Sequence, residues 1–569
     1  MLNPDAYEET TSDFLWSYII FSVIIALSGG MQYNLQRLYS SFASALSVKQ
    51  NRRRRNMGHT AQNEVKISDR KKEAVIAPEL HSQFIEFLGG CIYDGIWVGE
   101  DSDIPNYKGI RRDVVDALKE IEPPVMRWPG GCFADTYHWK NGIGKREDRP
   151  VTYNENFGTF EVDHNQFGTH EFLEFCEMLG AKPWLGVNVL SGSVGEMRDW
   201  VEYCNRSEET DLSNLRKENG HKEPFGVEYW GIGNEAWAGG GTMTPELYAQ
   251  EYRKYSSAMP RCDFRNAKPG EGLKLIACGP DGNKPKERVR WTKDFFAALA
   301  HYRQPQIDAL DLHFYNWNME QGDWSDVEFD EAAWDRVIES CFELEDVIGE
   351  QYDLIQEGLA SFPEEEGFFA TGAPHCDLIV GEWGNWHGSS FLARPALYQQ
   401  CTMRDAITTA LTLDIFHRNC DKVKMACVAQ TVNVLNALIL TEKEHTVLTP
   451  NYDVFLMYKV HRGARPMKLK KKDLDPKMHL FASCKGDEIY VNVVNADCKK
   501  AKDVTLHFEE DMEAVSTETL RGDCITDYNS VECPDKIRRK AGSLPEYGKD
   551  GFVFHAEAAS VNVLKFRKK

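Results

Sequence analysis

The chain has 569 residues and a formal charge of −22. Of these residues, 42% are hydrophobic and 27% are charged. This composition is typical of a globular protein and excludes disorder over most of its length. Nucleic acid and anionic membrane surfaces require a concentrated face of Lys and Arg, so the acidic excess predicts no nucleic-acid partner and favours a neutral substrate.

An uncharged, largely apolar stretch occupies residues 14–36 and is long enough to span a bilayer marginally. Acidic residues precede it and the basic run NRRRR (51–55) follows, which argues against a secretory signal and would leave the rest of the chain in the cytoplasm. Residues 1–62 are therefore interpreted as an N-terminal extension. It is a membrane anchor through residues 14–36, a poorly ordered tail, or a segment upstream of a true start such as Met57.

The 15 cysteines form no C-x-x-C pair and show no spacing of a zinc site or a disulfide framework. We therefore expect reduced, mostly buried thiols and a cytoplasmic location.

From about residue 80 onward, short apolar runs alternate with segments of helical periodicity. Eight strands with intervening helices predict a closed parallel (β/α)8 barrel over residues 80–458, with a doubly wound open sheet as the main competitor. The predicted strands are Phe84–Ile92, Val125–Trp128, Pro183–Val189, Val227–Gly233, Leu273–Cys278, Ile307–Phe314, Asp377–Glu382 and Val423–Gln430. The predicted helices are Arg111–Ile121, His170–Gly180, Val194–Cys204, Thr244–Met259, Glu287–Ala300, Glu331–Gln356 and Leu397–His417.

After about Val460 the pattern changes to alternating strands separated by turn residues, as in MHLFASCKGDEIYVNVVNA (478–496) and ASVNVLKFR (559–567). No long helix is predicted there. We expect an all-β, jelly-roll-like sandwich over residues 459–569. The segment NEVKISD (63–69) is predicted to add a strand to it, so residues 63–79 are assigned to the same domain.

Two glutamates fall where predicted strands end, the edge at which barrel enzymes carry their active sites. Glu235 follows the fourth strand in YWGIGNEAW, and Glu382 ends the seventh in LIVGEWGNW. Each lies beside a tryptophan, Trp237 or Trp383, which we expect to offer an apolar face to a sugar. Such a pair suits glycoside hydrolysis, in which one carboxyl protonates the leaving oxygen while the other attacks the anomeric carbon. For either glutamate alone, a solvated loop carboxylate is the simpler interpretation.

Other polar side chains lie at the ends of the remaining strands, where they could hold sugar hydroxyls. Each also has a structural interpretation: Arg127 could simply pair with a carboxylate, and His313 or Tyr315 could be satisfied core residues. The candidates at these strand ends are Glu86, Arg127, Asn188, Asn234, His313, Tyr315, Gln430 and Asn433.

Four motifs in order along the chain resemble the α-L-arabinofuranosidases of glycoside hydrolase family 51: VMRWPGGCFADTYHW (125–139), FGTHEF (167–172), YWGIGNEAW (229–237) and GEWGNW (381–386). The resemblance runs from about residue 63 to the C-terminus. It implies a retaining, exo-acting enzyme on a (β/α)8 barrel with a C-terminal β-sandwich, often assembled as a homo-oligomer. Such enzymes release terminal arabinofuranosyl groups from arabinan, arabinoxylan or their oligosaccharides.

By motif, the resemblance assigns the acid/base role to Glu235 and the nucleophile role to Glu382. Asn234 would hold the sugar 2-hydroxyl, and Trp386 matches an aromatic residue that closes over the site. The sequence departs from many relatives at Phe157 and Phe160, where they carry a Trp, so the leaving-group preference stays open. The remaining substrate-binding or nucleophile-supporting candidates are Glu86, Arg127, Cys132 (Asn in some relatives), His313, Tyr315 and Gln430.

A retaining mechanism requires Glu382 to be ionised while Glu235 is protonated, with the two carboxyl groups roughly 5 to 5.5 Å apart, and it needs no metal or organic cofactor. One alternative is a β-xylosidase or endoglucanase on a related barrel, which would need an open cleft. Another is a carbohydrate-binding protein that has lost catalysis, although the presence of both glutamates argues against it.

Overall fold

The computed structural model describes residues 63–69, 74–262, 272–319, 324–363, 375–549 and 551–569. The predicted extension, with its apolar stretch at residues 14–36, lies outside the described residues. Within the ranges described, no helix combines the length and the apolar character needed to cross a bilayer.

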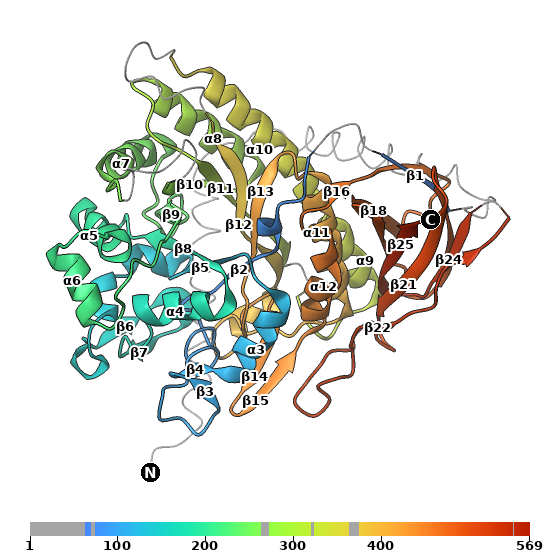
Figure 1. The fold of residues 1–569 in the computed structure, drawn as a ribbon, viewed down its shortest axis with the longest axis horizontal. Helices are drawn as coiled ribbons and strands as arrows, with labels where there is room; N and C mark the ends of the chain where they lie inside the picture. Colours follow the sequence, from blue (N-terminus) through green and yellow to red (C-terminus); the bar gives the residue numbers. More distant parts are fainter. Residues whose placement is uncertain (1–62, 70–73, 263–271, 320–323, 364–374, 550) are drawn as a thin grey trace, which may run out of the picture. The chain divides into compact units, whose positions relative to one another are not determined.

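Eight strands close into a barrel with helices around it (Figure 1). Every pair of neighbouring strands is parallel. The predicted (β/α)8 barrel is therefore confirmed, and the open doubly wound sheet is excluded. In chain order the strands are β2 (Ser82–Phe84), β5 (Val125–Trp128), β8 (Lys182–Val187), β9 (Tyr229–Ile232), β10 (Lys274–Asp281), β11 (Ala309–Asn318), β12 (Asp377–His387) and β13 (Val423–Val428).

The helices pack apolar side chains against the strands, and several of them begin with a side-chain cap. In α7 the hydroxyl of Thr244 accepts a hydrogen bond from the backbone N–H of Leu247, and Pro245 takes the first helical position. The principal helices are α3 (Arg112–Ile121), α4 (Thr169–Leu179), α5 (Val194–Asn205), α6 (Asp211–Glu218), α7 (Pro245–Ala258), α8 (Pro285–Ala300), α9 (Glu331–Ser340), α10 (Glu343–Ala360), α11 (Met403–Arg418) and α12 (Pro450–Tyr458).

Several predicted element limits are wrong. The strands β11 and β12 continue to Asn318 and His387, beyond the predicted ends at Phe314 and Glu382. The segment predicted as one helix over Glu331–Gln356 is the two helices α9 and α10. The last predicted helix begins at Met403, because Thr402 caps it, and not at Leu397. The first strand ends at Phe84: the chain turns at Gly89, whose φ is +50° and whose missing Cβ would lie 2.1 Å from the carbonyl oxygen of Ala396.

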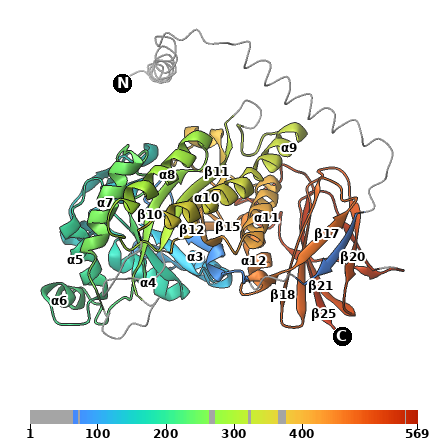
Figure 2. The same cartoon turned by 90° about the horizontal axis from the view of Figure 1, so that it is seen from above.

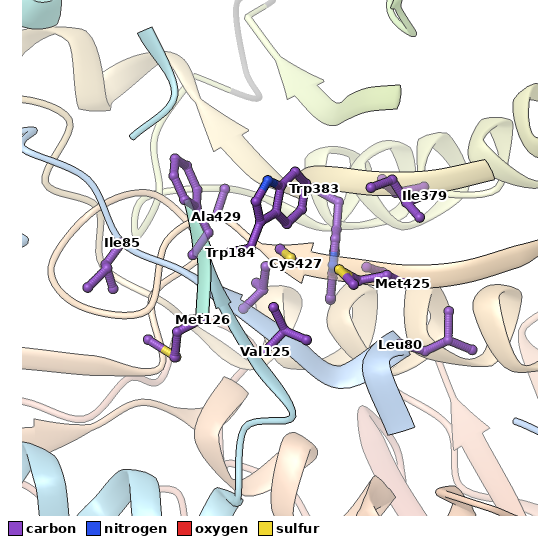
Figure 3. Close-up of a cluster of buried hydrophobic side chains, with 14 of the residues drawn as sticks. Leu80, Ile85, Val125, Met126, Trp184, Ile379, Trp383, Met425, Cys427 and Ala429 are labelled. Atoms are coloured by element: carbon purple, nitrogen blue, oxygen red, sulfur yellow. The ribbon is translucent and has the colours of Figure 1, made fainter. Parts of the chain in front are cut away.

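A cluster of buried apolar side chains packs against the barrel strands, and Figure 3 shows part of it. Trp383 belongs to this cluster, with its ring centroid 6.2 Å from that of Phe455 on α12 and 5.4 Å from that of Phe416 on α11. Successive side chains of a strand point to opposite faces, so Glu382 points into the barrel while Trp383 points to the helices. The expectation that Trp383 offers a face to a sugar is therefore wrong.

The C-terminal strands form two mainly antiparallel sheets, with the strand orders β17-β1-β20-β24-β23 and β16-β18-β19-β25-β21-β22. The segment predicted at residues 63–69 is β1 (Glu64–Ser68), which pairs antiparallel with β17 (Lys468–Lys472) and parallel with β20 (Lys502–Phe508). Figure 2 shows this blue strand beside the orange-red ones. The limits 80–458 for the barrel domain, and 63–79 with 459–569 for the sandwich domain, stay a prediction. The remaining sandwich strands are β16 (Arg465–Pro466), β18 (Met478–Lys485), β19 (Glu488–Asn495), β21 (Met512–Leu520), β22 (Lys540–Ala541), β23 (Glu546–Tyr547), β24 (Phe552–Ala556) and β25 (Ser560–Lys568).

Buried polar contacts tie the barrel helices to β19 and the turn that follows it. The indole Nε1 of Trp334 on α9 donates to the carbonyl oxygen of Ala496 at 2.9 Å. The amide of Asn492 on β19 donates to Asp414 of α11 at 2.7 Å. Each of these buried hydrogen bonds contributes about 0.5 to 1.5 kcal/mol to holding the two parts together.

Candidate active site

Two carboxyl groups face one another at the carboxyl end of the barrel strands. Glu382 lies within β12, and Glu235 lies in the turn after β9 with a φ of +39°. The backbone N–H of Ala238 donates to the carbonyl oxygen of Glu235 at 2.7 Å and closes this turn. One oxygen of each carboxyl group and one ring nitrogen of His313 all lie within 4.8 Å of one another. The two carboxyl groups therefore share a single small site.

Glu382 is surrounded by donors that favour its ionised form. Arg127 Nη1 donates to Oε1 at 2.8 Å, and the Tyr315 hydroxyl donates to Oε2 at 2.7 Å. Burial alone would raise the pKa of Glu382, but the charges of His313 and Arg127, together with the Tyr315 hydroxyl, hold it below its ordinary value. Glu382 is therefore a carboxylate at neutral pH.

The surroundings of Glu235, by contrast, favour its protonated form. Burial, with the negative charge of Glu382 adding to it, raises the pKa of Glu235, although the neighbouring His313 opposes this shift. His313 Nδ1 lies 2.8 Å from Oε1 of Glu235, and Cys132 Sγ lies 3.5 Å from Oε2. The environment therefore favours a proton on Glu235 and a charge on Glu382, the distribution that an acid and a nucleophile need.

Arg127 connects the two halves of the site, because its second terminal nitrogen donates to Asn234 Oδ1 at 2.5 Å. The backbone N–H of Asn234 in turn donates to Asp135 Oδ2 at 2.8 Å. The residue before the acid is thus fixed through its side chain and its backbone.

A third carboxyl group, Glu86, lies in the loop after β2. Gln430 Nε2 donates to its Oε2 at 2.7 Å, and Asn156 Nδ2 donates to its Oε1 at 2.8 Å. Burial and the charge of Glu382 raise the pKa of Glu86 to about 7. A carboxyl group held in this way can accept hydrogen bonds from a sugar hydroxyl or, when protonated, donate one.

Aromatic rings form one wall of the site around Trp386. Its ring centroid lies 4.9 Å from that of Tyr315, 5.0 Å from Trp317, 5.4 Å from Phe391 and 6.1 Å from Phe157. Trp386 is buried, whereas Trp317 and Phe157 are each 49% exposed. Within the described residues the buried indole Nε1 of Trp386 has no hydrogen-bond partner. This wall offers a ligand the exposed apolar faces of Trp317 and Phe157.

The ten predicted site residues are brought together at this edge of the barrel, while their individual roles stay predictions. The side chains of two other strand-end candidates form hydrogen bonds with loop backbone. The Asn188 side chain accepts from the backbone N–H of Ser191 at 2.9 Å, and Asn433 donates to the carbonyl oxygen of Gly90 at 2.7 Å. The ten residues are Glu86, Arg127, Cys132, Asn234, Glu235, His313, Tyr315, Glu382, Trp386 and Gln430.

Sequence reasoning missed Asp135, Asn156, Asp311 and Trp317. For Asp311 a signal was available, because it precedes His313 by two residues on a strand and therefore shares its face. Trp317 bears the same relation to Tyr315. Asn156 lies in a short turn of no recognisable pattern, so nothing in the sequence could have indicated it.

The group most suited to holding a metal ion, among the residues described, is Glu235, His313 and Glu382. Arg127 and His313 already place positive charge against these carboxyl groups, and the pKa of His313 is raised to about 10. A dication there would meet two cations at close range, so the arrangement fits proton transfer and nucleophilic attack better than metal binding.

A protonated and an ionised carboxyl group, facing one another at the carboxyl end of a closed parallel barrel beside an aromatic wall, define a glycoside hydrolase. The family model of the α-L-arabinofuranosidase 1 domain matches residues 117–333, and that of the α-L-arabinofuranosidase C-terminal domain matches residues 381–560. The chain therefore belongs to the α-L-arabinofuranosidases of glycoside hydrolase family 51.

Individual relatives support this membership. The chain is 38% identical over 486 residues to an intracellular exo-α-L-arabinofuranosidase of Bacteroides ovatus, covering 83% of this chain and 89% of the relative. It is 30% identical over 485 residues to a probable α-L-arabinofuranosidase C of Aspergillus fumigatus, covering 82% and 90%. The crystal structure of the family 51 arabinofuranosidase from Xanthomonas axonopodis pv. citri matches with a TM-score of 0.79 at 32% identity, covering 89% of this chain and 100% of that one.

Proposed function

We propose that the protein is a retaining, exo-acting α-L-arabinofuranosidase that releases terminal non-reducing α-L-arabinofuranosyl groups from arabinan, arabinoxylan or their oligosaccharides. The observation that carries this proposal is the approach of Glu235 and Glu382, with carboxyl oxygens within 4.8 Å of one another. Inverting enzymes keep roughly 6.5 to 9.5 Å between the two groups to admit a water molecule. Because one oxygen of each group lies this near the other, little room is left for an intervening water molecule, which supports direct attack by a carboxylate.

In the first step Glu382 attacks the anomeric carbon and forms a glycosyl ester, while Glu235 gives its proton to the leaving oxygen. In the second step Glu235 takes a proton from water, the water oxygen attacks the same carbon, and Glu382 leaves as a carboxylate. The ester formed in the first step removes the charge of Glu382, which lowers the pKa of Glu235 and suits it to act as a base.

The sugar is held by the polar residues around the two glutamates. We assign the bond to the 2-hydroxyl to Asn234, and the bonds to the remaining hydroxyls to the carboxyl group of Glu86 and the amide of Gln430. Trp386 and Phe157 close the aromatic side. Glu86, Glu382 and Trp386 are 4%, 5% and 7% exposed. Side chains buried to this degree suit a terminal sugar better than the interior of a polysaccharide chain, which supports exo action over an endoglucanase.

A panel of aryl glycosides tests this proposal on purified protein. We expect turnover of the α-L-arabinofuranoside and little or none of the β-xyloside and β-glucoside. Faster turnover of the xyloside would favour the β-xylosidase alternative, and failure on all three would favour a carbohydrate-binding protein.

We also infer that the enzyme acts in the cytoplasm and assembles as a homo-oligomer. The name of the Bacteroides relative supports the first inference, as do buried cysteines such as Cys91, Cys176 and Cys278, which form no disulfide. Membrane contact through residues 14–36 stays a prediction. Cell fractionation and light scattering test these points, and mature protein found in the medium after cleavage near residue 30 would overturn the location.

A further inference from the structure

Asp311 is a buried carboxylate next to, but outside, the pair of catalytic glutamates. It lies on β11 two residues before His313 and is 6% exposed. Its Oδ2 lies 3.2 Å from His313 Nε2, and its Oδ1 accepts a hydrogen bond of 2.6 Å from the backbone N–H of Gly381. A Cβ at Gly381 would lie 2.3 Å from Asp311 Oδ1, so a glycine is needed before Glu382 to admit this carboxylate.

His313 therefore stands between Asp311 and the catalytic glutamates. Its other ring nitrogen, Nδ1, lies 2.8 Å from Glu235 Oε1 and 3.6 Å from Glu382 Oε1. Both ring nitrogens face carboxyl oxygens. A neutral imidazole has one donor and one acceptor, whereas an imidazolium has two donors and satisfies both contacts.

We propose that Asp311 is a positioning residue that keeps His313 as an imidazolium throughout the reaction, so that Glu235 can change from acid to base without moving. The inference rests on the proposed retaining mechanism. Asp311 touches neither the sugar nor the reacting atoms and acts through His313.

The charges around His313 support this role. The groups that face it are Glu235 from the loop after β9, Glu382 from β12, Asp311 from its own strand, and Asp281, its register partner on β10. Arg127 adds positive charge through its pair with Glu382. Burial opposes charging, but Glu382 and Asp311 raise the pKa of His313 to about 10.

The intermediate shows why Asp311 is needed as well as Glu382. Once Glu382 is an ester it no longer carries the charge that stabilises the imidazolium. Asp311 then remains as a carboxylate in contact with His313. The positive ring in turn stabilises the carboxylate form of Glu235, which must accept a proton from water in the second step. The proton taken from water ends on Glu235, and the site returns to its starting state.

The variant Asp311→Asn removes the charge and keeps the contacts. The amide oxygen can still accept from Gly381, and the amide nitrogen can donate to His313 Nε2. His313 then stays neutral with its proton on Nδ1, still directed at Glu235. We expect kcat for a substrate with a good leaving group, which reports the second step, to fall about 10- to 100-fold, within the range of acid/base contributions. The acid limb of kcat/KM, which reports the free enzyme, should move to higher pH, because Glu382 loses a neighbouring cation.

A buried Asp–His pair outside the site gives a matched control. Asp405 Oδ1 lies 3.0 Å from His387 Nε2, and both side chains are fully buried. Asp405→Asn should lower the melting temperature without moving either pH limb.

The double variant Asp311→Asn/His313→Gln should lose no more activity than His313→Gln alone, because Asp311 acts through His313. The proposal would be overturned if the losses of activity in the two single variants multiplied in the double variant. It would also be overturned if the limbs of the pH profile did not move in Asp311→Asn.

A spectroscopic measurement decides the inference even if a variant fails to fold or the substrate proves different. In wild-type protein with 15N-labelled histidine, the ring of His313, assigned by comparison with His313→Gln, should still be protonated at a pH about one unit below its pKa of about 10. A neutral ring there would refute the role of Asp311, whereas a wild-type enzyme that is inactive on arabinofuranosides would refute only the proposed function.

Discussion

The hydroxyl of Tyr315 donates a 2.7 Å hydrogen bond to Oε2 of Glu382, opposite the Arg127 nitrogen that holds Oε1. A hydrogen bond to a charged group is worth about 1.5 to 3 kcal/mol, so Tyr315→Phe should lower kcat/KM about 10- to 100-fold. The pKa of Glu382 should rise, because the ionised form loses a donor. The acid limb of kcat/KM for an aryl arabinofuranoside should therefore move to higher pH. An unmoved limb would mean that Tyr315 serves only to pack against Trp386.

The wild-type pH profile should be bell-shaped, because activity needs Glu382 ionised and Glu235 protonated. The pKa of Glu382 is held below the ordinary 4.5, so the rate should fall only when the pH drops below that value. Burial raises the pKa of Glu235 above 4.5, so the rate should fall again at higher pH. In Glu235→Gln, the rate of the first step on a substrate whose leaving group needs no proton should still fall at low pH. It should no longer fall at high pH. A basic limb that persists there would belong to another group.

The barrel and the two glutamates could be predicted because they follow from local signals: apolar runs of strand length, helical periodicity, and carboxylates where the runs end. Features that depend on tertiary packing could not be predicted from these local signals. The first strand ends at Phe84, and the chain then turns at Gly89, where it passes against Ala396. Trp383 was misassigned although strand alternation already separates it from Glu382, and the same alternation could have paired Asp311 with His313. The turn that brings Asn156 to Glu86 has no sequence signature.

Acid should destabilise the fold through three buried histidines. The Nε2 atoms of His81 and His417 lie 2.9 Å apart, and the ring centroids of His417 and His461 lie 5.1 Å apart. Burial lowers the pKa of all three, to about 4 for His461 against an ordinary 6.5. The unfolded chain therefore binds more protons, so stability is complete above about 6.5 and declines as the pH falls toward 4.

Melting temperatures measured between these two values test this prediction. His461→Gln should reduce the pH dependence, whereas His164→Gln, at an exposed position, should leave it unchanged. Equal pH dependence in all three proteins would show that other groups cause the acid loss.

The sandwich should be required for a soluble barrel. Truncation after Val460 removes β17 and β20, the partners of β1, together with the contacts that Trp334 and Asp414 make. We expect aggregation on expression, because apolar and polar groups buried at that junction would be exposed. A truncated protein that stays monodisperse and fully active would show that the two domains are independent.

The central claim is that Glu235 is the acid/base and Glu382 the nucleophile, and azide rescue tests it most directly. In Glu235→Ala, a dinitrophenyl arabinofuranoside should still form the glycosyl ester, because its leaving group needs no proton, and the ester should accumulate for want of a base. Azide needs no base and fits the space left by the carboxyl group. It should restore turnover and give an arabinofuranosyl azide of retained configuration, while Glu382→Ala stays inactive on every substrate. Rescue of Glu382→Ala with an inverted product, and no effect of azide on Glu235→Ala, would contradict the account by exchanging the two roles.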